Sequence, residues 1–147
     1  MPYASSMASL WVKRAAWLSL AALWMGLIFY LSSRSSIPVD IVESGTPASL
    51  TLRKASHFVA FGTLALFLRW GLGPWRSSLK VAVVAFALTV AYAFGDEFHQ
   101  TFTPGRTGSA TDVAIDSAGA LAAVTLWRAL ERWTALVHLW QRIQNSR

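Results

Sequence analysis

Residues 15–33 read AAWLSLAALWMGLIFYLSS, a run of 19 uncharged residues between Arg14 and Arg34. A helix needs about 20 apolar residues to cross the hydrocarbon core of a bilayer, so this run predicts a transmembrane helix. The alternative is a cleaved secretory signal peptide, since Lys13 and Arg14 precede the run. The late start and the length of the run favour a span that the protein retains.

The composition of the chain also indicates a membrane protein. Hydrophobic residues make up 54% of it and charged residues 14%, whereas about a quarter of the residues of a typical soluble protein are charged. The eight Trp suit a protein anchored at lipid–water interfaces. Three further apolar runs follow, at residues 55–68, 81–95 and 117–127. Together the runs predict an all-α polytopic membrane protein with a bundle of four transmembrane helices.

The chain after residue 128 has a different pattern. Apolar residues recur there at helical spacing, with Leu130, Trp133 and Trp140 on one face and charged residues on the other. This pattern predicts a C-terminal amphipathic helix that lies on the inner surface of the membrane. The predicted division is a transmembrane domain at residues 1–128 and a cytoplasmic tail helix at residues 129–147.

Basic residues set the predicted orientation. Seven of them flank the boundaries on the side of the two termini, against four on the other side; the seven are Lys13, Arg14, Arg69, Arg76, Lys80, Arg128 and Arg132. The positive-inside rule then puts both termini in the cytoplasm. Because the basic residues do not cluster on one face, the net charge of +6 does not indicate nucleic-acid binding. The chain has no cysteine, which excludes a disulfide framework, a thiol nucleophile and a thiolate metal site.

Polar residues gather where the third run ends. Five charged residues lie between positions 96 and 116. If the third helix continues to Gln100, Asp96 and His99 fall on one face of it, with Glu97 beside them. Ionisable groups near a bilayer are costly, so they are by default a hypothesis of a functional site.

Two other helices bring polar residues to the same side of the membrane. Lys54 and His57 are one turn apart at the start of the second helix, and Asp112 and Asp116 are one turn apart at the start of the fourth. Gly119 continues that face and allows close approach of two helix backbones. Each group also has a structural alternative, because carboxylates are favoured at a helix N-terminus and single histidines commonly pack in a core.

The segment Thr103-Pro104-Gly105-Arg106 predicts a type II turn that folds Arg106 back over the carboxylates. A guanidinium pairs with a carboxylate or a phosphate, so its partner is either internal or a ligand. The predicted ligand-binding residues are Arg34, Lys54, His57, Asp96, Glu97, His99, Gln100, Arg106, Asp112 and Asp116.

These residues resemble those of the VanZ-like family of membrane proteins. The matching motifs are Leu31-Ser32-Ser33, Lys54-x-x-His57-Phe58, Asp96-Glu97-Phe98-His99-Gln100-x-Phe102-x-Pro104-Gly105-Arg106 and Asp112-x-x-x-Asp116-x-x-Gly119. The family often has Asn at the position of Asp116. The resemblance implies a small multi-pass protein of the bacterial inner membrane, linked in some members to reduced teicoplanin sensitivity. It implies no agreed biochemical activity.

Three functions are therefore open, and membrane lipid is a partner in each. The favoured one is a binding protein without a cofactor, whose outward-facing pocket takes a polar or anionic envelope ligand such as the head group of a lipid-linked cell-wall precursor or a glycopeptide. The second is an intramembrane metal-assisted or acid–base hydrolase with Zn²⁺ or Mg²⁺. Its candidate catalytic residues are His57, Asp96, Glu97 and His99. The third is a small transporter or flippase.

Overall fold

The computed structural model of the chain describes residues 2–34, 46–73, 78–104 and 106–145, and these residues form four helices and no strand. The helices are α1 (Pro2–Ser32), α2 (Pro47–Leu72), α3 (Leu79–Gln100) and α4 (Ala110–Asn145). All four are long and apolar enough to cross a membrane. The predicted all-α bundle of four potential spans is confirmed. Arg76 and Gly105, used above for the orientation and the turn, lie outside the described residues.

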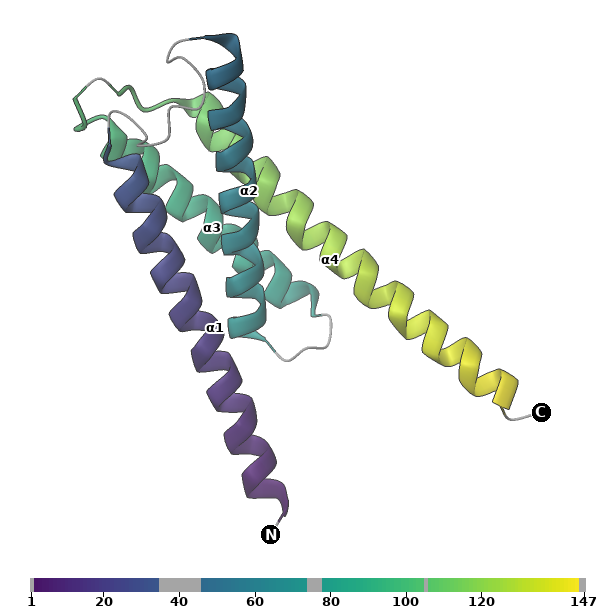
Figure 1. Cartoon of the computed structure of the whole chain (residues 1–147). Helices are drawn as coiled ribbons and strands as arrows, with labels where there is room; N and C mark the ends of the chain where they lie inside the picture. The colour runs from purple at the N-terminus through teal and green to yellow at the C-terminus, as the bar shows by residue number, and fades with distance from the viewer. Residues whose placement is uncertain (1, 35–45, 74–77, 105, 146–147) are drawn as a thin grey trace.

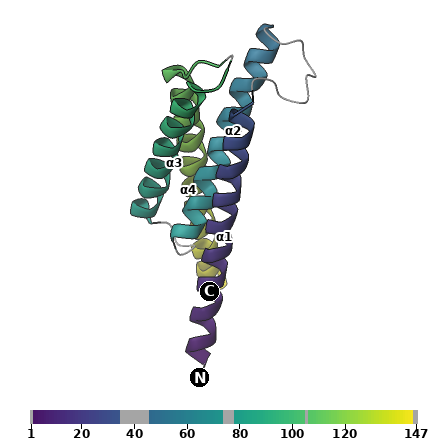
Figure 2. The same cartoon turned by 90° about the vertical axis from the view of Figure 1, so that its left-hand side faces the viewer.

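Successive helices run in opposite directions, so the bundle has two distinct ends (Figures 1 and 2). We call the end where α1 finishes and α2 and α4 begin the site end. The opposite end, which faces the two chain termini, is the terminal end. Helix α2 packs extensively against each of the other three helices, whereas α3 barely contacts α1, so α2 is the centre of the bundle.

The helices are longer than the apolar runs from which they were predicted, because helical turns with polar residues extend them. Helix α2 begins eight residues before the run at 55–68, with Pro47 in its first turn. The side chain of Thr46 accepts a hydrogen bond from the Ser49 N–H at 3.2 Å, which caps the helix start. Helix α3 continues to Gln100, which meets the condition set above, and carries its two acidic residues in its last two turns.

The predicted tail helix is the C-terminal half of α4 and not a separate helix. The chain has no Gly or Pro between residues 120 and 145, so nothing interrupts the helical backbone there. Glu131, beyond the predicted division at residue 128, forms an ion pair with Arg69 of α2 at 3.2 Å. The apolar face of this segment is exposed, with Trp133 and Trp140 each more than 60% accessible. Its position on a membrane surface stays a prediction.

Two glycines allow α2 and α4 to pack closely. A Cβ atom on Gly119 of α4 would lie 2.1 Å from the backbone oxygen of Phe58 in α2. A Cβ atom on Gly62 of α2 would lie 3.1 Å from the backbone oxygen of Gly119. The close approach predicted from Gly119 is confirmed. His57 immediately precedes Phe58, and Asp116 lies one turn before Gly119. The close contact of Gly119 with Phe58 therefore brings His57 within reach of Asp116.

The outside of the bundle is apolar and part of its inside is polar. Leu23 is 72% exposed and Leu126 is 70% exposed, whereas Thr89 and Asp96 are each 1% exposed. This distribution suits helices surrounded by lipid, because exposed leucine has no cost in hydrocarbon. The buried polar residues therefore need partners from neighbouring helices.

Candidate functional site

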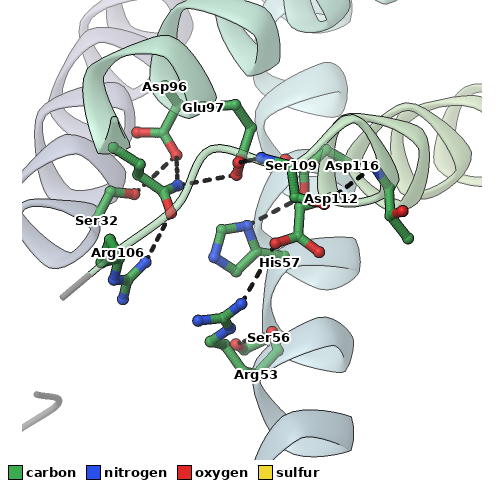
Figure 3. A network of polar contacts seen from close by, with 12 residues as sticks. Ser32, Arg53, Ser56, His57, Asp96, Glu97, Arg106, Ser109, Asp112 and Asp116 are labelled. Carbon is green, nitrogen blue, oxygen red and sulfur yellow. Dashed lines mark hydrogen bonds and ion pairs between the residues drawn. The ribbon is translucent and has the colours of Figure 1, made fainter. Parts of the chain in front are cut away.

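Four acidic side chains are buried at the site end. Asp96 and Glu97 come from α3 and are 1% and 4% exposed; Asp112 and Asp116 come from α4 and are 9% and 0% exposed. Figure 3 shows them converging with side chains of α1 and α2. Burying a carboxylate is costly unless it is paired and hydrogen-bonded. Their contacts therefore define what this region can do.

His57 of α2 is paired with Asp116. Its Nδ1 lies 3.2 Å from Asp116 Oδ1, and its ring stacks on Phe61. With the proton on Nδ1, that nitrogen donates to the carboxylate and Nε2 keeps a free lone pair. Asp116 Oδ2 is buried and has no hydrogen-bond partner among the described residues. The pair resembles the arrangement by which a carboxylate orients an imidazole for a ligand or a proton.

Gln100 connects the two acidic residues of α3 to Arg106. Its Nε2 donates to Asp96 Oδ2 at 3.1 Å and to Glu97 Oε1 at 2.9 Å. Its Oε1 accepts from Arg106 Nη1 at 2.9 Å. Gln100 is 2% exposed, so its amide is committed to these bonds. Asp96 Oδ2 also accepts from the Ser32 hydroxyl at 2.8 Å, which adds α1 to the network (Figure 3).

Of the two partners left open for Arg106, the structure shows an internal one, and it is the amide of Gln100 and not a carboxylate. The Arg106 N–H donates to the Thr103 oxygen at 3.1 Å, which closes a turn, but the guanidinium reaches the amide of Gln100 first. Burial lowers the pKa of Arg106 below its usual value, and the neighbouring Arg53 lowers it further. Asp96, Glu97 and Asp112 act in the opposite direction. An arginine stays charged through such a shift, so the site keeps this cation.

Arg53 is a site residue that the sequence reasoning missed. Its Nη2 lies 3.4 Å from Asp112 Oδ2 (Figure 3). The residue precedes His57 by four positions, whereas the predicted Lys54 precedes it by three. Both spacings place a side chain on the same helix face, and the i,i+4 spacing was the available signal. Lys54 is exposed, and no hydrogen bond or ion pair of the described residues joins it to the carboxylates.

Two other predicted residues make their contacts with residues outside the cluster. Arg34 is exposed and lies over the ring of Tyr30, whose hydroxyl accepts from it. His99 Nε2 lies 3.1 Å from the Ser33 hydroxyl, and its ring packs 4.2 Å from that of Phe29. Of the ten predicted residues, the structure brings together seven: His57, Asp96, Glu97, Gln100, Arg106, Asp112 and Asp116.

Glu97 also ties α3 to the beginning of α4. Its Oε2 accepts from the Ser109 N–H at 2.8 Å, and the Ser109 hydroxyl accepts from the Thr111 N–H at 3.2 Å. A carboxylate at this position is favoured by the positive end of the helix dipole. Glu97 therefore holds the two helices that carry the acidic residues in register.

A cavity of about 120 Å³ adjoins this cluster between α1 and α2. Its charged or titratable lining residues are Arg53, His57 and Arg106, and the rest of its wall is mostly apolar. The lining comprises Ile28, Leu31, Ser32, Arg53, Ser56, His57, Ala60, Phe61 and Arg106. Such a volume equals about four liquid water molecules, which suits one phosphate-sized group. The arrangement presents donors and positive charge to the cavity and keeps the carboxylates behind them.

Three groups of the cluster also have the composition of a metal site. A ring nitrogen of His57 and one carboxylate oxygen each of Asp96 and Glu97 lie within 4.8 Å of one another. Of the four candidate catalytic residues of the hydrolase hypothesis, His99 does not join this group, because it packs against α1.

The fold and the cluster together define a polytopic helical membrane protein with a charged site at one end of its bundle. The chain matches the family model VanZ/LLP1 over residues 17–131, and it belongs to that family. The resemblance stated from the motifs is thus confirmed, and the match includes the whole cluster from Arg53 to Asp116. Comparison with curated proteins and with solved structures gives no match.

Proposed function

We propose that this protein binds the anionic head group of a membrane-embedded envelope lipid at its site end. The observation that carries the proposal is the cavity lined by Arg53, His57 and Arg106. Guanidinium groups bind phosphate oxygens in a fixed geometry, and the apolar wall from α1 and α2 suits the start of a lipid chain. A lipid-linked cell-wall precursor has both parts, a phosphate-containing head group and a long hydrocarbon chain.

The proposed orientation places this cavity on the outer side of the bacterial inner membrane. Basic residues near the terminal end include Lys13, Arg14, Lys80 and Arg128, so the positive-inside rule favours a cytoplasmic terminal end. Cysteine labelling with an impermeant thiol reagent in intact cells tests this proposal, since the chain has no cysteine of its own. Thr107→Cys, exposed at the site end, should react, and Lys80→Cys, exposed at the start of α3, should not. Labelling of Lys80→Cys alone would reverse the orientation.

In this setting the protein contributes to glycopeptide resistance, with teicoplanin as the drug that the VanZ family name suggests. Binding of the precursor head group would withhold it from a lipophilic glycopeptide that reaches it from the membrane surface. The role needs no turnover, because occupancy of the head group is sufficient.

The binding proposal is tested with the full-length protein in lipid nanodiscs. The probes are a fluorescent polyprenyl diphosphate and the polyprenyl alcohol with the same chain. We expect the diphosphate to bind more tightly than the alcohol, because only the diphosphate reaches the two guanidiniums. Arg53→Gln and Arg106→Gln should each weaken diphosphate binding by about 10-fold or more, which corresponds to about 1.5–3 kcal/mol for a hydrogen bond to a charged group.

Arg132→Gln is the matched control, since Arg132 is an exposed arginine of α4 outside the cluster. It should bind the diphosphate like the wild type. Equal affinity for diphosphate and alcohol, or equal affinity of Arg53→Gln and the wild type, would refute the proposal.

Hydrolysis of the phosphoanhydride bond of a bound diphosphate is a second candidate, and the His57–Asp116 pair at 3.2 Å favours it. An imidazole held by a carboxylate can take a proton from water. The nanodisc experiment tests this directly by following release of inorganic phosphate from the diphosphate. Release that disappears in His57→Gln would favour the hydrolase, whereas binding without release would leave the binding protein.

A further inference from the structure

The buried charges at the site end do not balance. Four carboxylates, those of Asp96, Glu97, Asp112 and Asp116, are at most 9% exposed as residues. Among the described residues, the permanent cations in contact with the cluster are Arg53 and Arg106, so negative charge there exceeds positive charge by two when His57 is neutral. Unpaired buried charge is expensive, and a protein normally neutralises it by protons or by a bound cation.

The oxygens that remain unpartnered point to a cation. Asp96 Oδ1 and Asp116 Oδ2 are buried and accept no hydrogen bond from the described residues. Asp96 belongs to the group of three residues whose ligand atoms lie within 4.8 Å of one another, with Glu97 and His57. Asp116 contacts the Nδ1 atom of His57. Asp96 Oδ1 is available to a metal ion, because the bond from Gln100 uses the other oxygen of Asp96. Each oxygen of Glu97 already accepts one hydrogen bond, and its second lone pair is available to an ion.

We propose that His57, Asp96 and Glu97 bind a divalent cation. An ion at about 2.0–2.2 Å from each ligand atom places those atoms roughly 3–4 Å apart, so the three groups, now within 4.8 Å of one another, need to close by at most about 1–2 Å. One imidazole and two carboxylates form a mixed nitrogen and oxygen donor set, which suits Zn²⁺ or Mn²⁺. The two positive charges of the ion offset the excess of two negative charges.

Asp116 takes a supporting role at this site. Its bond to His57 Nδ1 directs the ring and leaves Nε2 as the nitrogen with a lone pair for the ion. Asp116 is therefore a positioning residue for the cation and not one of its ligands. Asn at this position would keep a hydrogen bond to Nδ1 while supplying less charge, so it should weaken binding without abolishing it.

The cation site also bears on the ligand, and this step rests on the function proposed above. His57 lines the cavity, as does Ser32, which donates to Asp96. A cation held by His57 and Asp96 would lie at the wall of that cavity, facing the same space as Arg53 and Arg106. A phosphate-containing head group would then meet two guanidiniums and one divalent ion, so its binding should depend on the ion.

The experiment uses the full-length protein in nanodiscs after removal of metal with a chelator. Mn²⁺ is titrated and followed by the loss of the free-ion electron paramagnetic resonance signal, and Zn²⁺ is added as a competitor. We expect one Mn²⁺ per chain, displaced by Zn²⁺. Asp96→Asn and Glu97→Gln should each weaken Mn²⁺ binding by more than about 100-fold, and Asp116→Asn should weaken it by about 10- to 100-fold.

Glu131→Gln makes the same chemical change at the terminal end and should still bind one ion per folded chain. Unfolding of the wild type with and without Mn²⁺ gives a second readout, because an ion that binds only the folded state raises the melting temperature. This readout does not depend on the folding of any variant.

The outcomes separate the cation site from the head-group site. A wild type that binds neither Mn²⁺ nor Zn²⁺, or equal affinity of Glu97→Gln and the wild type, overturns the cation site even if the polyprenyl diphosphate binds. One ion per chain that is lost in Glu97→Gln supports the cation site even if the diphosphate does not bind. Diphosphate binding that requires the ion supports both.

Discussion

Polar networks lie at both ends of this bundle, and they differ in how their charges are matched. At the terminal end, Arg69 is 1% exposed and its Nη2 donates to both oxygens of Glu131 at 3.2 Å. Trp127 Nε1 donates to the same carboxylate at 2.8 Å. At the site end, four carboxylates share two arginines, a histidine and the amide of Gln100, beside a cavity.

The atoms that remain unpartnered differ in the same way. In the part of the chain that the structure describes, they are two donors at the terminal end, Arg69 Nε and Trp70 Nε1, and two carboxylate oxygens at the site end, of Asp96 and Asp116. The ion pair of Arg69 with Glu131 holds α2 against α4, and its two charges are balanced, so it does not favour binding of a further ion. A cluster with excess negative charge retains the capacity to bind something. The comparison teaches that burial of charge alone does not identify a site, whereas imbalance of charge next to a cavity does.

The largest stability effect should come from breaking the matched pair. Glu131→Gln leaves the buried guanidinium of Arg69 without its counter-ion, and we expect a loss of about 3–5 kcal/mol in unfolding free energy. Thermal unfolding in micelles measures it, with Arg132→Gln, exposed one residue later, as the control. The double variant Arg69→Met/Glu131→Leu should recover most of the loss. A loss under about 1 kcal/mol for Glu131→Gln would mean that the pair is solvated, and the comparison would fail.

The next effect should come from the close approach that positions His57 opposite Asp116. Gly119→Ala places a Cβ atom 2.1 Å from the Phe58 oxygen, so α2 and α4 must separate, at a cost of about 1–3 kcal/mol. Gly95→Ala is the matched control, since nothing lies within 4 Å of a Cβ atom there. That control should be neutral or stabilising, because Ala is the better residue inside a helix. Equal melting of the two variants would show that the helices are not packed this closely.

A smaller loss should follow removal of Arg106. The residue is partly exposed and contacts the amide of Gln100 and not a carboxylate, so Arg106→Ala strands no ion-pair partner. We expect about 1 kcal/mol, the typical net contribution of one hydrogen bond, together with reduced binding of the diphosphate probe. Melting in the absence of ligand measures the first part. A loss as large as that of Glu131→Gln would show that Arg106 neutralises the carboxylates directly.

The smallest change in stability should come from neutralising an acidic residue of the site. Asp96→Asn keeps an oxygen for the Ser32 and Gln100 donors and removes one charge from a cluster that has an excess. In metal-free buffer its melting temperature should stay near that of the wild type or rise, as is common where a site is built for binding and not for stability. Glu131→Gln is the same change at the other end and sets the scale. A large loss for Asp96→Asn would show that this carboxylate is structural.

Periodicity and apolar content were sufficient to predict that four stretches of the chain form helices and which of their residues share a face, but not where each helix begins and ends. The run at residues 15–33, the extension of α3 to Gln100 and the spacing of Asp112 and Asp116 are local patterns, and the structure contains all three. Gly119 belongs to the same class, because a small residue on a buried helix face predicts a close contact. A pattern of this kind depends only on the geometry of one helix.

The partners of these residues were decided by tertiary structure. Either Lys54 or Arg53 could have lain on the face of α2 that carries His57. The rotation of α2 against α4 brought Arg53 to Asp112. His99 carries the same chemical groups as His57, yet it packs against α1. Within the described residues, Arg106 is connected to the carboxylates through the amide of Gln100. The physical reason is that a sequence determines the relative directions of side chains within a helix, whereas the rotation of each helix about its axis depends on packing contacts such as that of Gly119 with Phe58.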